Sequence, residues 1–165
     1  MTKLSILALA LTTATACGTK QQYIGGTKIP YSPQTKSAIE AVEEYRLAVE
    51  RGDAEALMLM AHKQYWEDSG TPSGSDDYGY AGLATVLQTR FKMASDIRYS
   101  VKYVGVSMQC KDELTPGCKA TVDVLVDASF TIQDVKGQAR RPDKRDQAQF
   151  FLEWDGRRWL FLSGM

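Results

Sequence analysis

The feature that most constrains this chain is a change of hydrophobic period close to Asp96. Before it, apolar residues recur at the spacing of an amphipathic helix, and after it they alternate with polar residues, as in a half-buried strand. The alternation covers 97–108 and returns over 120–128. Because a sheet with one apolar face needs a layer to cover it, this order predicts an α+β fold in which N-terminal helices pack on an antiparallel meander.

Three helices are expected before the sheet. The first is predicted to start at Ser37, three residues before Glu40 in the pattern of a capping box, and to end at Gly52. Asp53 is predicted to cap a short second helix, and a third is expected over 80–94. The apolar stripe of the first helix comprises Ala38, Ile39, Val42, Tyr45, Ala48 and Val49.

The other segments are divided by turn residues. The dipeptide Asp155-Gly156 is a strong signal for a hairpin between two final strands. Loops are expected where Gly, Ser, Pro and charged residues gather. The expected pieces are a short extended segment at 64–68, a loop at 69–79, a polar hairpin loop at 134–146, and strands at 147–154 and 158–162.

Composition excludes some classes of function. The 165 residues include 20 basic and 20 acidic ones, so the basic excess of a nucleic-acid-binding protein is absent and no nucleic-acid partner is expected. His62 is the one histidine, and there is no Cys/His cluster from which to build a zinc site. We therefore expect neither a metal nor a cofactor.

The first sixteen residues have the character of a secretory signal. Lys3 is followed by an apolar run, 4–16, whose helix of about 20 Å is too short for a hydrocarbon core of roughly 30 Å. The run ends in Ala14-Thr15-Ala16-Cys17, which resembles the lipobox of bacterial lipoproteins, although Leu is usual where Ala14 stands. The resemblance implies that Cys17 becomes the N-terminus and carries diacylglycerol and palmitate. The alternative is an ordinary cleaved signal with an incidental cysteine.

The lipoprotein interpretation also implies a place in the cell. Gly18, rather than Asp, follows the cysteine, which resembles the signal for outer-membrane retention. The expected organisation is a signal peptide at 1–16, a lipidated N-terminus and flexible polar tether at 17–36, and a domain at 37–165. The chain would then contact the membrane through its anchor and face the periplasm of the bacterial envelope.

The two remaining cysteines, Cys110 and Cys118, suit a disulfide in such an oxidising compartment. They flank a segment that ends in Pro116-Gly117, which fits the central positions of a type II turn. With extended segments on both sides, we predict a hairpin cross-linked at its neck. Two buried free thiols are the alternative.

The order of elements resembles the nuclear-transport-factor-2-like (NTF2-like) superfamily, also described as cystatin-like. The resemblance rests on helix, Gly52-Asp53, helix, a short strand ending in Glu67-Asp68, a third helix, and strands closing on 154–159 (Trp-Asp-Gly-Arg-Arg-Trp). It implies a cone, with a curved sheet wrapped around helices and a cavity at the wide end. The group includes ketosteroid isomerases, dehydratases, cyclases and non-catalytic members, so it implies a fold more than a chemistry.

Ketosteroid isomerases suggest which residues would be catalytic. Their oxyanion donor corresponds to Tyr45, seven residues before Gly52, and their general base to Asp68. Their third group, a protonated acid, would fall near Phe150, where this chain has no acid. We expect Asp68 and Tyr45 to face a shared cavity, with Asp68 and Trp66 on one side of the short strand and Glu67 on the other.

Each candidate also has a structural interpretation. Tyr45 suits the core, and Asp68 suits a cap on the following loop. The aromatic residues Trp66, Tyr99 and Tyr103 could line a ligand pocket, yet such alternation is also ordinary sheet core.

Three hypotheses follow. The first is a non-catalytic envelope module that binds a small apolar ligand or a segment of an envelope protein. The second is an isomerase, dehydratase or cyclase that uses Asp68 as base with Tyr45 or Tyr65 as donor. The third is a structural subunit that contacts its partner, including a second copy in a homodimer, through the exposed face of the sheet. The missing acid ranks the first and third ahead of the second.

Overall fold

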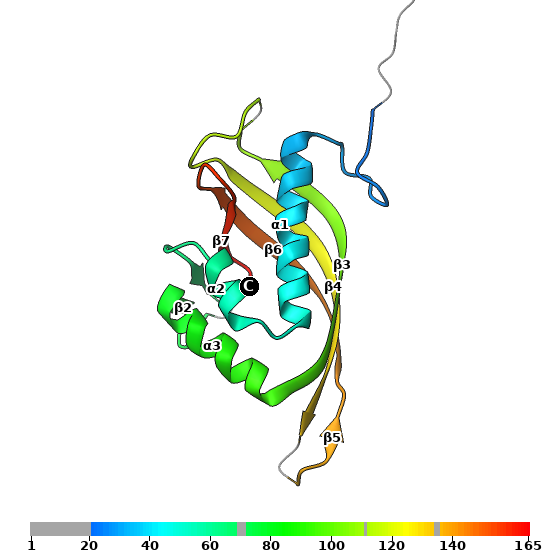
Figure 1. Ribbon diagram of the computed structural model, residues 1–165, viewed down its shortest axis with the longest axis vertical. Coiled ribbons are helices and arrows are strands. Elements are labelled where there is room, and N and C mark those ends of the chain that lie inside the picture. The colour runs from blue at the N-terminus through cyan, green and yellow to red at the C-terminus, as the bar shows by residue number, and fades with distance from the viewer. Residues whose placement is uncertain (1–20, 69–71, 111, 134–135) are drawn as a thin grey trace, which may run out of the picture.

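The computed structural model describes residues 21–68, 72–110, 112–133 and 136–165, and these form a helical layer against a curved antiparallel sheet (Figure 1). The predicted α+β architecture is confirmed. The helices in this part of the chain are α1 (Pro33–Glu50), α2 (Ala54–Met60) and α3 (Tyr80–Met93). The strands there are β1 (Trp66–Glu67), β2 (Tyr78–Gly79), β3 (Ala94–Met108), β4 (Lys119–Gln133), β5 (Ala139–Arg140), β6 (Asp143–Trp154) and β7 (Trp159–Ser163).

The main sheet has the order β3-β4-β6-β7, and every pair is antiparallel. β5 pairs with the end of β4, and β1 pairs with β2 in a separate small sheet. The register of β3 on β4 shifts between Ser95 and Arg98 and again between Tyr103 and Gly105. Such bulges increase the local bend of a strand, so the long strands curve around α1 (Figure 1).

The core lies between α1 and the concave face of the sheet. Five of the six residues in the predicted stripe of α1 are buried, and Val49 is partly buried. They meet the inward-facing residues of β4, which alternate as the sequence predicted. The largest side chains that are wholly buried here are Tyr65, Phe150, Phe161, Leu57, Leu83 and Leu152.

Polar side chains of α1 also form hydrogen bonds with backbone groups of the edge strand β3. Glu50 Oε1 accepts a hydrogen bond from the Tyr99 backbone N–H at 3.0 Å, and an Arg46 guanidinium nitrogen lies 3.3 Å from the Tyr99 carbonyl oxygen. That backbone N–H, followed by Arg46, lowers the pKa of Glu50 from its ordinary value. An edge strand exposes unpaired backbone groups, so this contact both covers the edge and fixes α1 on it.

α1 begins four residues before the predicted start. Ser32 is the N-cap, its side chain accepts from the Thr35 backbone N–H at 3.0 Å, and Thr35 completes a capping box. Pro33 occupies the first helical position, where its missing N–H costs nothing. The predicted cap, Ser37, instead donates to the Gln34 carbonyl within the helix.

Two further differences concern segments that were expected to be irregular. Within the expected tether, Ile24 N–H bonds the Ile29 carbonyl at 2.9 Å, and Ile29 is buried. The expected polar loop at 134–146 contains β5 and the start of β6.

The hairpin at Asp155-Gly156 is present, with Asp155 Oδ1 accepting from two backbone N–H groups. Among the described helices none is long and apolar enough to cross a membrane.

Candidate functional site

Tyr45 lies in the core and not on a cavity wall. Its ring contacts Tyr99, Phe150 and Phe161, with centroid distances of 6.0, 5.1 and 5.3 Å. The side chain is 5% exposed. Burial raises the pKa of Tyr45 well above its ordinary value, and the neighbouring Tyr99 raises it further. The ring of Tyr45 is therefore part of the aromatic core.

The prediction that Asp68 shares a cavity with Tyr45 is wrong. Asp68 is exposed, and Trp66, on the same side of the short strand, is 56% exposed. Trp66 instead lies against the backbone of Gly79, its partner in the β1–β2 pair. The alternation was correct, but the opposite face of the segment is the buried one.

The inward residues of this segment are Tyr65 and Glu67. The Tyr65 N–H donates to the His62 carbonyl at 2.9 Å. This turn directs the Tyr65 side chain into the core, where it is 2% exposed. The Tyr65 hydroxyl lies 3.0 Å from Glu67 Oε2. Burial is the main cause of the raised pKa of Tyr65, and the Glu67 carboxylate raises it further. Glu67 is thus the carboxylate that faces inward here, a residue the sequence analysis did not select.

The aromatic residues of β3 pack between the sheet and α1. Tyr99 contacts Tyr45, and the Tyr103 hydroxyl donates to Glu43 Oε2 at 3.2 Å. Burial raises the pKa of both phenols. Both side chains therefore serve the helix–sheet contact, as ordinary core residues do.

Phe150 occupies the place where an isomerase would carry its protonated acid. It is fully buried, and its ring lies 5.7 Å from that of Phe161. Tyr45, Phe150 and Phe161 form a cluster of three rings in mutual contact. The interior at this point is filled by the protein's own side chains.

The predicted disulfide is present. Cys110 and Cys118 are bonded with their Cα atoms 5.8 Å apart. The turn before Cys118 closes through its N–H to the Thr115 carbonyl at 2.9 Å, with Gly117 at a φ of 87°. A positive φ at the third position is the geometry of a type II turn. Cys17, the predicted lipid site, lies outside the described residues. Within the described residues, no group of His, Cys, Asp and Glu is suited to hold a metal ion.

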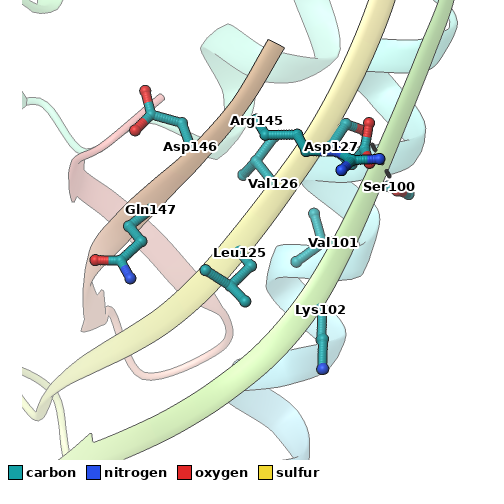
Figure 2. A pocket seen from close by; sticks show the side chains of 9 residues that line it. All are labelled: Ser100, Val101, Lys102, Leu125, Val126, Asp127, Arg145, Asp146 and Gln147. Atoms are coloured by element: carbon teal, nitrogen blue, oxygen red, sulfur yellow. Dashed lines mark hydrogen bonds and ion pairs between the residues drawn. The ribbon is translucent and has the colours of Figure 1, made fainter. Parts of the chain in front are cut away.

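A shallow hollow of about 750 Å³ lies over the middle of the sheet (Figure 2). Two cross-strand rows of β3, β4 and β6 line it, Ser100–Asp127–Arg145 and Lys102–Leu125–Gln147. The row between them contains Val126, which is buried in the core, so the two rows face outward. Arg145 and Asp127 form an ion pair at 2.8 Å.

The same outward face carries exposed apolar side chains. Val104, Leu125 and Phe151 are 57, 38 and 41% exposed. They belong to β3, β4 and β6, three strands that are adjacent in the sheet. Val104 and Leu125 lie on neighbouring strands, and the row Asp123–Gln149 separates Leu125 from Phe151.

Comparison with known proteins identifies the fold. No family model and no curated protein matches the sequence. A ketosteroid isomerase-like protein from Erwinia carotovora atroseptica matches with a TM-score of 0.59 and 18% identity over 81% of this chain and 94% of that one. A protein assigned as a scytalone dehydratase from Novosphingobium aromaticivorans has a TM-score of 0.59 and 13% identity, covering 79 and 80%.

A third solved structure carries the fold name. It is a protein from Streptomyces avermitilis assigned as a dehydratase of the NTF2-like family, with a TM-score of 0.56 and 14% identity over 78% of this chain and 92% of that one. At these identities the likeness concerns the fold and not the chemistry. The chain has the NTF2-like fold, as its order of elements indicated.

Proposed function

We propose that this chain is a non-catalytic interaction module, held at the bacterial envelope by a lipid on Cys17. The carrying observation is the filled interior: Tyr45 is enclosed by Tyr99, Phe150 and Phe161. An isomerase or dehydratase needs a base within reach of substrate in such an interior. Here Asp68 is on the outside, and the carboxylate that faces inward, Glu67, is bonded to the Tyr65 hydroxyl and the Gly164 N–H, which argues against the enzymatic alternative.

The outward face of the sheet is the surface we propose for the partner. It combines the exposed side chains of Val104, Leu125 and Phe151 with the hollow that the two outward rows line. Aromatic and aliphatic side chains inside a polar surround are typical of the centre of an interface. We propose a protein partner on this face, with a second copy of the chain as the first candidate.

A photo-crosslinking residue at Phe151 tests this surface in cells that produce the full-length chain. The matched control is the same residue at Trp66, another exposed aromatic that is not part of the sheet face. An adduct at position 151 and none at 66 is expected, and twice the mass of the chain would identify a second copy. Absence of an adduct at 151, or equal adducts at both positions, contradicts the proposal.

The anchor has its own test. Mass spectrometry of the mature protein should find Cys17 as the acylated N-terminus, with diacylglycerol and palmitate attached. Two acyl chains suffice for stable anchoring, whereas one alone gives only marginal membrane binding. Cys17→Ser should release the protein from the membrane fraction. An unmodified Cys17, or cleavage at another residue, would exclude the lipoprotein interpretation. Outer-membrane placement is checked by fractionating the two membranes.

A further inference from the structure

Residues 22–31, directly before α1, form a small hairpin where a tether was expected. Tyr23 and Pro30 make an antiparallel bridge, and the Tyr31 N–H donates to the Gln22 carbonyl at 2.8 Å. The chain turns between the two arms, where Gly26 has a φ of 76°, in the left-handed region that favours glycine. This N-terminal hairpin (22–31) is therefore an ordered part of the protein that lies ahead of the domain.

The N-terminal hairpin joins α1 without an intervening linker. Ile29 is 3% exposed, and the Pro30 carbonyl accepts a hydrogen bond from the Thr35 hydroxyl in the first turn of α1 at 3.1 Å. The next residues are Tyr31 and Ser32, and Ser32 is already the N-cap of the helix. Figure 1 shows the hairpin beside the N-terminal end of α1, at the end of the molecule away from β5. A surface that holds the hairpin therefore also orients the domain.

The exposed side chains of the N-terminal hairpin combine aromatic rings with positive charge. Tyr23 and Tyr31 are 53 and 42% exposed, and Lys28 is exposed as well. The sequence has no acidic residue before Glu40, so Lys20 and Lys28 give this end of the chain a positive charge. Tyrosine is enriched where a membrane meets water, and lysines near a membrane surface are attracted by anionic headgroups. The hairpin thus has the composition of a membrane-surface contact.

The length of chain ahead of the hairpin keeps it close to the proposed anchor. From Cys17 to Gln21 a fully extended chain spans at most about 14 Å. A lipid on Cys17 holds that residue at the membrane surface, so the hairpin cannot move far from the headgroups. A contact that is weak by itself is favoured under such a constraint, because the anchor raises its effective concentration at the membrane.

We propose that the N-terminal hairpin (22–31) is a second membrane contact, which binds the anionic headgroup layer through Tyr23, Lys28 and Tyr31. The proposal rests on the lipid at Cys17 proposed above, which supplies the first contact. Because the hairpin continues directly into α1, its binding turns the N-terminal end of α1 toward the membrane and β5 away from it (Figure 1). The domain is then held in one orientation at the membrane surface.

The test uses the chain from Cys17 onward, which contains every described residue, with one hexadecyl chain coupled to the Cys17 thiol through a maleimide. The Cys110–Cys118 bond leaves Cys17 as the free thiol. A single chain of this kind gives only marginal membrane binding, so a second contact is measurable as a change in partition. Partition is measured by sedimentation with vesicles of phosphatidylethanolamine and phosphatidylglycerol, and with vesicles of phosphatidylcholine.

Lys28→Gln should lower partition onto the anionic vesicles about fivefold and leave partition onto phosphatidylcholine unchanged. Tyr23→Ser should lower partition onto both kinds of vesicle, since it removes an interfacial ring. The matched control is Lys144→Gln, because Lys144 is an exposed lysine of β6 near β5, at the opposite end of the molecule. This control should change neither partition.

No loss of partition in Lys28→Gln and Tyr23→Ser would overturn the proposal. A loss in Lys144→Gln as large as that in Lys28→Gln would also overturn it, because the membrane contact would then not be specific to the hairpin. Since the hexadecyl chain is attached chemically, these results do not depend on whether cells acylate Cys17. The mass of the mature protein decides that question separately.

Discussion

Removing the Cys110–Cys118 disulfide should lower the free energy of unfolding by about 2.5 kcal/mol. The bond closes a loop with a sequence separation of 8, and the chain-entropy relation for a loop of that length gives this value. For a chain of this size it corresponds to a fall in melting temperature of about 5–10 °C. The effect arises mainly in the unfolded state, which becomes less restricted when the bond is absent.

The double variant Cys110→Ala/Cys118→Ala is compared with the unaltered protein by urea unfolding, with and without a reductant. Because Cys118 is 5% exposed, its replacement also removes a buried side chain. The reductant separates the two effects, since it opens the bond without removing atoms. It should lower the midpoint of the unaltered protein and leave that of the variant unchanged, and the m-value should rise as the unfolded chain expands. Equal midpoints with and without reductant would refute the reasoning.

Three further predictions concern the core, a helix cap and pH. Phe150→Ala should lower the free energy of unfolding in urea by about 3–5 kcal/mol because it leaves a cavity, whereas Phe151→Ala on the outward face should lower it far less. Similar losses for the two variants would contradict the assignment of Phe150 to the inner face and Phe151 to the outer face. Asp53→Ala should cost about 1 kcal/mol, since Asp53 Oδ1 accepts from the Ala56 N–H at 3.0 Å, and no loss would mean the cap is not formed. Burial raises the pKa of Tyr45 and Tyr99, so unfolding favours ionisation of these phenols. The free energy of unfolding should stay constant below about pH 10 and fall as pH rises above it. Tyr99→Phe should make this fall with pH less steep, as measured by urea unfolding at a series of pH values between about 8 and 11.5.

The sequence was most informative where a pattern was long. The stripe of α1 and the alternation of β3 and β4 extend over many residues, so their faces and order could be predicted. β5 could not, because Ala139 and Arg140 are both exposed and carry no buried face. The start of α1 was missed because Ser37 and Glu40 imitate a capping box that Ser32 and Thr35 form.

The prediction of the candidate site was wrong because it chose the wrong face of the 65–68 segment as the buried one. Tyr65 and Glu67 alternate with Trp66 and Asp68, so each side of the segment offers one aromatic ring and one carboxylate. Hydrophobic alternation cannot distinguish two faces of such similar composition. The turn at His62 decides between them, and it brings Tyr65 inward. The contact of Glu67 with Gly164, 97 residues away in sequence, has no local signal at all.

The central proposal is that the interior, filled by the chain's own residues, is not a catalytic site. An NMR titration of the full-length protein with a β,γ-unsaturated ketosteroid tests it most directly, because one sample reports binding and turnover together. The account predicts no saturable shift of the Tyr45 and Phe150 signals and no conversion of the steroid. Saturable shifts of both signals, accompanied by isomerisation above the rate in buffer, would contradict it.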